Sequence, residues 1–356
     1  MNETFKSDQK KLTANIKAGG CAAKLGSKEL EEILADIPVL QSPQLIAGIE
    51  GFEDAAVYKI SEDIAIIQTI DFFPPLLDDP FIYGQIAAAN ALSDVYAMGG
   101  RPVLALNVLC FPTCDYPLEV VKKILEGGAS KVAEAGASLA GGHSIQISEP
   151  VYGLSLMGLV SPDRIFTNSG ALENDALILT KPIGVGVALL GMKGGQLKAA
   201  SQDDLINNLT SLNKDALEAT EGFPVNAMTD ITGFGLAGHL HEMAKSSGLS
   251  AEVYVDRIEF FDGVVELAQE GFVPAGAYGN RQSFSEVVTY KKDLNLAIQD
   301  LLFDPQTSGG LLISTPEKSS DELVARLKSK GLKASKIGCF VSAESTGENK
   351  GHVFFS

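Results

Sequence analysis

The sequence contains no long hydrophobic run. Among its 356 residues there is no stretch of about 18 consecutive apolar residues, which is the length that crosses a bilayer as a helix. Residues 1–17 are polar and lysine-rich, and they lack the apolar segment of a secretory signal peptide. We therefore expect neither a membrane span nor a membrane partner.

Cysteine is scarce and scattered. The four cysteines are Cys21, Cys110, Cys114 and Cys339, and their spacing is not that of a disulfide framework. No cysteine–histidine spacing indicates a zinc site. Free thiols persist in reducing compartments, so this pattern predicts a cytoplasmic protein.

Positive charge is also in short supply. The chain carries 28 lysines and arginines against 45 aspartates and glutamates, a formal net charge of −17. That balance argues against nucleic acid as a general partner. It does not exclude nucleotides, because carboxylates can meet phosphates through a bridging divalent cation.

The length and the order of elements predict two mixed α/β domains. Turn-rich residues 161–170 separate them, so we expect a flexible glycine-rich arm (1–26), an N-terminal domain (27–162) and a C-terminal domain (171–356). Expected helices are 27–37, 80–98, 117–136, 203–219, 235–247 and 319–330. Expected strands are 55–60, 64–70, 103–109, 150–160, 176–180, 225–229, 251–255, 310–314, 335–342 and 351–355.

The segment 64–100 combines several polar side chains in one strand–helix unit. A buried strand ends at Asp71, and Asp79 followed by proline is typical of a helix N-terminus. Asn90 and Asp94 are four residues apart, so they share one helix face. The strand and helix carboxylates could converge on one cation. Alternatively, Asp71 caps the turn and Asp94 is solvated.

Further acids lie beside glycine-rich or small-residue backbone. Asp54 stands where a strand begins, and Asp230 stands between a strand and a helix. Together with Asp71 and Asp94 they form an all-oxygen ligand set, which suits Mg²⁺. Taken singly, each acid is more often a cap than a ligand.

Two segments have features of phosphate-binding loops, and the sequence has no Walker loop. Residues 181–186 follow a strand but lack the third glycine of a dinucleotide fingerprint. In residues 140–144, two glycines in a turn would free backbone N–H groups for an anion, and His143 and Ser144 add donors. The alternative for this segment is an ordinary tight turn.

The arm carries a possible reactive thiol. Cys21 follows two glycines, and Lys24 lies three residues later, where its ammonium would favour the thiolate and lower the thiol pKa. A flexible arm could close over a site as a lid. The alternative is an ordinary thiol in a loose terminus.

In this order, the segments resemble the selenophosphate synthetase family, also called selenide, water dikinase. The resemblance covers nearly the whole chain and rests on residues 20–24, 54–58, 69–73, 88–100, 140–144, 228–235 and 304–310. The aspartate and Gly-His-Ser motifs recur in a wider ATP-using superfamily. It includes aminoimidazole ribonucleotide synthetase, thiamine-monophosphate kinase and a hydrogenase-maturation protein. The Cys-x-x-Lys arm narrows the match.

This resemblance implies a fold and a reaction. The fold would be aminoimidazole ribonucleotide synthetase-like, and the N-terminal domain would form a homodimer. ATP, held through magnesium ions, would react with selenide and water to give selenophosphate, orthophosphate and AMP. Selenophosphate would supply selenium for selenocysteine and selenouridine synthesis, and a selenium-delivery protein is an implied partner.

The resemblance also implies residue roles. Cys21 and Lys24 match catalytic residues, and Asp54, Asp71, Asp94 and Asp230 match metal ligands. Nucleotide contacts match Lys24, Gly51, Phe52, Glu53, Asp71, Asp94, Gly142, His143 and Ser144. The chain departs from some members at Ala23, where they carry a second cysteine, so Cys21 would act alone. The rival interpretations are another ATP-dependent member of the superfamily and a non-catalytic nucleotide-binding regulator.

Overall fold

The computed structural model describes residues 10–24, 26, 32–34, 37, 42–48, 53–347 and 349–356. The helix expected at 27–37 lies mostly outside these residues, as do Gly51 and Phe52. Within the described part, no helix is both long and apolar enough to cross a membrane.

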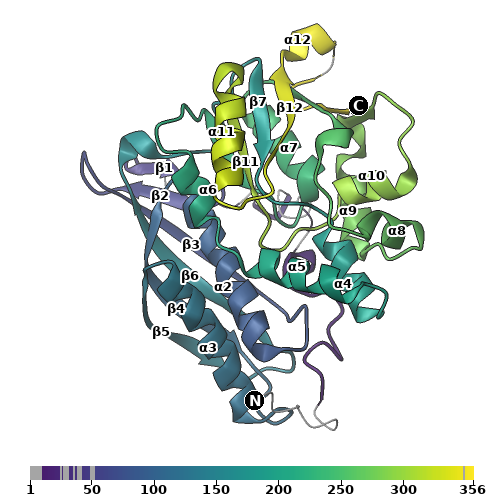
Figure 1. The fold of residues 1–356 in the computed structure, drawn as a ribbon. Coiled ribbons are helices and arrows are strands. Elements are labelled where there is room, and N and C mark those ends of the chain that lie inside the picture. The colour runs from purple at the N-terminus through teal and green to yellow at the C-terminus, as the bar shows by residue number, and fades with distance from the viewer. Residues whose placement is uncertain are drawn as a thin grey trace.

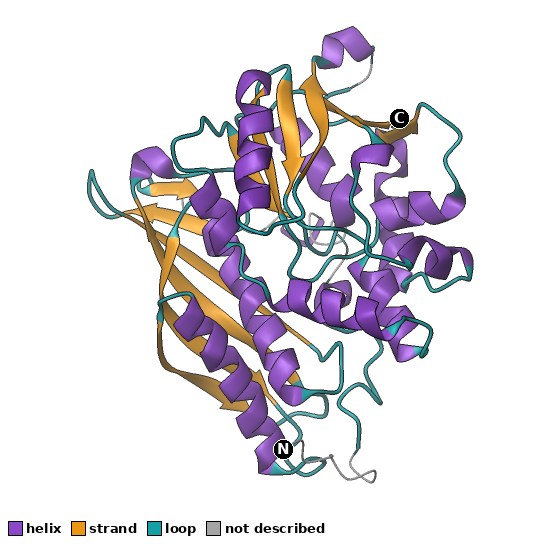
Figure 2. Cartoon of the chain, viewed as in Figure 1, coloured by secondary structure: helices purple, strands orange, loops and turns teal. Residues whose placement is uncertain are grey.

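The first half of the chain forms a six-stranded sheet. Its strands, in spatial order, are β1 (Leu45–Ala47), β2 (Ala56–Lys59), β3 (Ala65–Phe73), β6 (Val151–Val160), β4 (Arg101–Cys110) and β5 (Ser138–Ile145). Neighbours are antiparallel except β4 and β5, which are parallel. Helices α2 (Pro80–Ala97) and α3 (Leu118–Glu134) lie together over one face (Figures 1 and 2).

Successive side chains of β3 point to opposite faces of the sheet, and only one of these faces lies against the helices. Thr69, Asp71 and Phe73 are buried, whereas Ile70 and Phe72 between them are about half exposed. This is the period of two that a strand imposes on its side chains. The polar side chains Thr69 and Asp71 therefore lie on the inner face, beside α2.

The helix over β3 begins as the sequence predicts. The Asp79 side chain accepts a hydrogen bond from the Ile82 N–H at 3.0 Å, with proline at the first helical position. α2 then packs very closely against α3. A Cβ on Gly84 would lie 2.0 Å from the Ile124 carbonyl oxygen, so only glycine fits there.

The second half forms a seven-stranded sheet. Its order is β10 (Val288–Tyr290), β13 (Val353–Phe355), β9 (Ser250–Val253), β12 (Ser335–Val341), β7 (Asp175–Leu179), β11 (Leu311–Pro316) and β8 (Ala227–Asp230). The accompanying helices are α4 (Val185–Lys193), α5 (Ala199–Thr210), α6 (Lys214–Ala219), α7 (Gly235–Ser246), α8 (Val264–Gln269), α9 (Ala275–Phe284), α10 (Leu296–Leu302), α11 (Glu317–Ser329) and α12 (Ala343–Thr346). Two mixed α/β halves were predicted, and this is confirmed. The predicted boundaries at 26, 162 and 171 stay a prediction.

Three local predictions are wrong. The single helix expected at 203–219 is two helices, α5 and α6. The strand expected to end before Asp71 continues to Phe73, so Asp71 lies inside it. The turn expected at 140–144 is strand β5, paired with β4 through an irregular register. A Cβ on Gly142 would lie 2.1 Å from the Asn107 carbonyl oxygen, so its glycine serves close strand packing.

Residues 10–24 are packed against the rest of the chain. The Asp78 carboxylate accepts hydrogen bonds from the Thr13 N–H and hydroxyl, and the Gly20 N–H donates to the Pro74 carbonyl at 3.0 Å. Leu12 is buried. The expected loose arm is thus a docked segment here, and residues 1–9 lie outside the described part. Across the molecule, α2 contacts β8, α5 and α6, so this helix borders both halves (Figure 1).

Candidate active site

Strand β3 and helix α2 meet through two polar pairs. The Asn90 amide donates a short hydrogen bond to Asp71, and the Thr69 hydroxyl donates to Asp94 at 2.5 Å. Residues two apart on a strand and four apart on a helix advance by similar distances, so both pairs form along the same line. The predicted shared face of Asn90 and Asp94 thus meets the strand that carries Asp71.

Cys21 is held at the end of this line. It lies in a 3₁₀ turn, η1 (Gly20–Ala23), and is 1% exposed. Its thiol donates to the Asn90 side-chain oxygen at 3.3 Å, and its N–H donates to the Thr307 hydroxyl oxygen at 3.0 Å. The N-terminal segment therefore reaches α2 in the first half and the loop 304–310 in the second.

The expected lowered pKa of Cys21 is wrong for this arrangement. Burial raises the pKa of the thiol to about 12, and the nearby Lys24 ammonium only partly offsets this. A buried thiolate would lose its hydration, and one cation does not replace it. Cys21 is a protonated thiol near neutral pH in this state.

Lys24 pairs with the strand carboxylate. Its ammonium lies 3.1 Å from an Asp71 oxygen, and its side chain is 40% exposed. Burial alone would lower the pKa of Lys24, but the negative charge of Asp71, which also accepts a hydrogen bond from the ammonium, helps to raise it above the ordinary range. Lys24 is therefore a fixed cation whose position is set by Asp71.

Two more acids, Asp54 and Asp230, each accept a hydrogen bond from a residue of the opposite half. The Thr229 hydroxyl donates to Asp54 at 2.8 Å, and the Ser93 hydroxyl donates to Asp230 at 2.5 Å. Burial raises the pKa of Asp54 and Asp94 well above ordinary values, and the charge of Asp230 raises both further. Burial raises the pKa of Asp230 as well. The four predicted acids thus contribute to one electrostatic cluster, with Asp71 acting on Asp94 and Asp230.

The donor set fits a magnesium site that substrate phosphates complete. In the described part of the chain, no three acidic, histidine or cysteine side chains form a ready-made metal cage. One Asp54 oxygen is buried without a hydrogen-bond partner. Mg²⁺ is usually bound by one or two carboxylates together with phosphate oxygens, so an incomplete cage with an unsatisfied oxygen suits it.

The other predicted nucleotide contacts lie further apart. Glu53 accepts a hydrogen bond from the Asn168 N–H at 2.8 Å, and burial raises its pKa. Gly142, His143 and Ser144 are on the exposed edge strand β5. Strands β4 and β6 separate β5 from β3. Within one chain, the sheet therefore does not bring residues 142–144 to the carboxylates.

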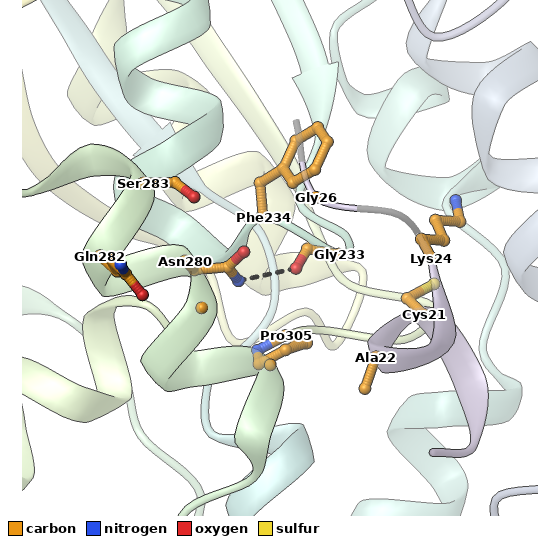
Figure 3. Close-up of a pocket in the computed structure, with 12 residues that line it drawn as sticks. Cys21, Ala22, Lys24, Gly26, Gly233, Phe234, Asn280, Gln282, Ser283 and Pro305 are labelled. Carbon is orange, nitrogen blue, oxygen red and sulfur yellow. Dashed lines mark hydrogen bonds between the residues drawn. The ribbon is translucent and has the colours of Figure 1, made fainter. Parts of the chain in front are cut away.

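A cavity of about 520 Å³ opens beside Cys21 and Lys24. Figure 3 shows these two residues on one side and Asn280, Gln282 and Ser283 of α9 on the other. Asn280 donates to the Gly233 carbonyl at 2.8 Å and so fixes the loop between them. A small substrate in this cavity would be in contact with the predicted catalytic pair.

Sequence reasoning did not identify Thr307 and Ser308 as site residues. The loop 304–310 is buried throughout, and its polar composition gave no signal of that burial.

The same loop binds the backbone N–H groups of the glycine-containing segment 181–186, which the sequence had offered as a weak phosphate-binding motif. Gln306 accepts hydrogen bonds from the Gly184 and Val185 N–H groups, and Asp304 accepts one from Gly186. These side chains occupy the N-terminus of α4, where a phosphate would bind.

Comparison with known proteins identifies the class of protein from its two domains. Residues 52–160 match the AIR synthase related protein, N-terminal domain family, and residues 173–348 match the corresponding C-terminal domain family. Hydrogenase maturation protein HypE in complex with ATP has a similar fold. Its TM-score is 0.63 at 17% identity, and the match covers 92% of this chain and 90% of that one.

Sequence relatives narrow the assignment. The chain is 48% identical over 334 residues to a selenide, water dikinase of Clostridioides difficile (strain 630), covering 94% of this chain and 96% of the relative. It is 47% identical over 327 residues to selenide, water dikinase 2 of Peptoclostridium acidaminophilum, covering 92% and 94%. The chain belongs to the selenide, water dikinase family.

Proposed function

We propose that this protein makes selenophosphate from selenide, ATP and water, with AMP and orthophosphate as the other products. The observation that carries the proposal is the docking of Cys21 and Lys24 against Asn90 and Asp71, beside a cavity large enough for a small substrate. This arrangement joins the feature that narrows the family, the Cys-x-x-Lys segment, to the carboxylate cluster.

Selenide would enter the cavity and attack the γ-phosphorus of ATP. The bond to the β,γ-bridging oxygen would break, and the selenium–phosphorus bond would form. Lys24 would stabilise negative charge on the transferred group, since its ammonium is held by Asp71 and stays protonated. Cys21 would face the incoming selenide as a protonated thiol. Water would then cleave the bound ADP to AMP and orthophosphate.

We assign Mg²⁺ to Asp54, Asp71, Asp94 and Asp230. A cation held by these carboxylates would neutralise negative charge on the phosphates of the substrate. Burial and the charge of Asp230 raise the pKa values of both Asp54 and Asp94, and these shifts, with the unpartnered Asp54 oxygen, support this assignment. Like charges buried together are stabilised by a counter-ion, so the cluster favours a cation.

Nucleotide contacts are proposed for Lys24, Glu53, Asp71, Asp94, Gly142, His143 and Ser144. Gly51 and Phe52 complete that set from the sequence and lie outside the described residues. In a single chain, β5 is remote from β3. A second copy of the chain could present residues 142–144 to the site, which would link nucleotide binding to dimerisation.

A homodimer is supported by the uncovered face of the first sheet. Large apolar side chains on this face are 40–57% exposed: Ile70, Phe72, Leu106 and Ile145. A contiguous exposed apolar surface on a soluble protein is typical of an interface. We further propose that the protein acts in the cytoplasm and receives selenium from a delivery protein, as the family resemblance implies.

The decisive experiment is product analysis of the purified protein. Phosphorus NMR of a selenide-dependent turnover should show selenophosphate, orthophosphate and AMP in equal amounts, without ADP accumulating. Stoichiometric free ADP would indicate an ordinary kinase. ATP binding without selenide-dependent consumption would indicate a nucleotide-binding regulator.

A further inference from the structure

The side-chain oxygen of Asn90 is a shared acceptor for the N-terminal segment and for loop 304–310 of the second half. The Asn90 oxygen that accepts the Cys21 thiol hydrogen also accepts the Ser308 N–H at 2.7 Å. The preceding residue, Thr307, accepts the Cys21 N–H. The positions of Cys21 and Asn90 therefore both depend on the conformation of Ser308 and its neighbour.

Ser308 has an unfavourable backbone conformation. Its φ is +49°, in the left-handed region, and it is one of two non-glycine residues with positive φ among the described residues. The left-handed conformation is unfavourable for a residue with a Cβ. The Ser308 hydroxyl is buried without a hydrogen-bond partner, so it does not offset this cost. Other contacts must hold the residue.

Lys181 provides such a contact from strand β7's end. Its ammonium donates to the carbonyl oxygens of Ser308 at 2.9 Å, Ser211 at 2.9 Å and Asn208 at 3.3 Å. An ammonium has three N–H donors, so these bonds use all of them. Charge-assisted hydrogen bonds of this kind are about twice as strong as neutral ones. Lys181 thus connects the C-terminal end of α5 to Ser308.

The Lys181 ammonium lies in the protein interior, where packing alone would not favour a charged group. Lys181 is 3% exposed, and no carboxylate lies within ion-pair distance of it in the part of the chain that the structure describes. Burial lowers the pKa of its ammonium to about 7, the charge of Asp230 opposes the change, and the charge of Lys131 adds to it, so removal of Lys131 would favour the Lys181 ammonium. An uncompensated buried cation is destabilising. Its retention is explained by the three carbonyls that it gathers.

We propose that Lys181 is a positioning residue for the reaction, acting through the Ser308 carbonyl to hold Asn90 and Cys21 in place. Lys181 makes no hydrogen bond to the carboxylates, so its hydrogen-bonded connection to Asn90 and Cys21 passes through the Ser308 backbone. The expected effect of Lys181 on turnover rests on the proposed function. Its expected effect on the position of Cys21 rests on geometry alone.

The test compares Lys181→Met with a matched control, Lys131→Met. Lys131 is also buried (7% exposed), but it lies on α3 and pairs with Glu134 at 2.6 Å. In Lys181→Met, iodoacetamide should label Cys21 at least about tenfold faster, because local opening exposes the thiol. Labelling of Cys339 in the same sample is the internal reference. In Lys131→Met, Cys21 labelling should stay at the parent rate.

Kinetics provide a second readout. In Lys181→Met, kcat for selenide-dependent turnover should fall about tenfold to a hundredfold, since a small displacement of a catalytic group has this effect. The KM for ATP should change less than kcat, because Lys181 makes no hydrogen bond to the carboxylates and Cys21 is nearer to the loop that it holds. If kcat and the KM for ATP both fell while the rate of Cys21 labelling stayed unchanged, the proposal would be overturned.

A double variant separates positioning from general stability. Glycine adopts positive φ freely, so adding Ser308→Gly to Lys181→Met should restore part of the Cys21 protection. Failure of the double variant to recover any protection would overturn the proposal. If Lys181→Met does not fold, Lys181→Gln takes its place; because glutamine keeps two N–H donors, Cys21 labelling should rise less than about tenfold but still exceed that of Lys131→Met. Should the parent enzyme lack selenide-dependent turnover, the proposed function fails, while Cys21 labelling still decides the role of Lys181.

Discussion

The Cys21 thiol donates a hydrogen bond to the Asn90 side-chain oxygen at 3.3 Å, across 69 positions of the chain. The Asn90 amide nitrogen in turn donates to Asp71, and Asp71 holds Lys24. One asparagine therefore joins the two residues of the N-terminal motif to the carboxylate on β3. This relationship makes the thiol, the ammonium and the carboxylate a single unit, which the predictions below test.

We expect Cys21→Ser to reduce selenophosphate formation by at least about 100-fold, within the range that a lost catalytic group produces. Serine keeps a hydroxyl that can donate to Asn90, so folding and nucleotide binding should persist. AMP release measures turnover, and calorimetry measures binding of ATP. Cys339→Ser, which removes a thiol from β12, is the control and should retain activity. Parent-level turnover in Cys21→Ser would exclude a catalytic role for sulfur.

Lys24→Ala should produce a comparable loss of turnover for a different reason. It removes the cation beside Asp71. Because a fixed positive charge stabilises the transferring phosphoryl group, kcat should fall more than the affinity for ATP changes. Lys59→Ala, which removes a surface ammonium paired with Glu62, provides the control. An increase in KM with unchanged kcat would mean that Lys24 only binds substrate.

Asp54→Asn, Asp94→Asn and Asp230→Asn should each weaken Mg²⁺-dependent ATP binding. Each should also reduce the rise in Tm that saturating Mg-ATP gives the parent, since ligand stabilisation follows affinity by mass action. Asp175→Asn is the matched control. Asp175 is buried too, but it accepts hydrogen bonds from Asn226 and Ser314 within the second half. This control should lower Tm while the Mg-ATP increment stays as in the parent.

The stability of the metal-free protein should fall as pH rises from about 5 to 8. The pKa values of Asp54, Asp94 and Asp230 are raised above 3.8 in the folded state. The folded state therefore binds more protons than the unfolded state across this window, and raising the pH removes that advantage. Mg²⁺ favours the ionised carboxylates, so its increment to Tm should grow with pH. A pH-independent increment measured by calorimetry would contradict the shared cluster.

The alkylation rate of Cys21 should keep rising with pH in the unliganded protein. Because burial raises its pKa to about 12, the thiolate fraction increases about tenfold per pH unit below that value. Peptide mass spectrometry after iodoacetamide treatment, between about pH 7 and pH 10, measures this slope. A plateau near the ordinary thiol value of 9.0 would show that Cys21 is not desolvated.

Phe72→Glu should shift the protein towards monomers. Phe72 lies on the uncovered face of the first sheet and is 48% exposed, so a charge there would be buried in the proposed interface. Light scattering coupled to size-exclusion chromatography measures the mass in solution. Leu118→Glu is the control, because Leu118 is 72% exposed on α3, at the opposite face. Dissociation by both variants, or by neither, would argue against this interface.

Much of the local structure could be predicted because single-residue signals decide it. Asp79 followed by proline fixes the start of α2, and its cap forms as expected. A strand was predicted at 64–70, where β3 forms, and Asn90 and Asp94 share a face as their spacing requires. The single helix predicted at 203–219 is interrupted at residues 211–213. Contacts with Lys181 and the buried Asn213 end α5 there instead.

The protonation state of Cys21 could not be predicted. The sequence shows an ammonium three residues away, which by itself lowers a thiol pKa. It does not show that the turn carrying Cys21 is buried between α2 and loop 304–310, where desolvation outweighs one cation. Burial depends on segments 69 and 286 residues away, so no local pattern records it.

The sequence by itself determined the family, the two α/β halves and the identity of the acids, because these follow from local residue order and from resemblance. Only the tertiary structure decided that Ser308, strained and held by Lys181, shares an acceptor with Cys21. It also decided that Asp54 and Asp230 meet residues of the opposite half. Such pairings depend on how β3, α2 and loop 304–310 pack in space, which side-chain volume and burial govern and which neighbours in sequence do not specify.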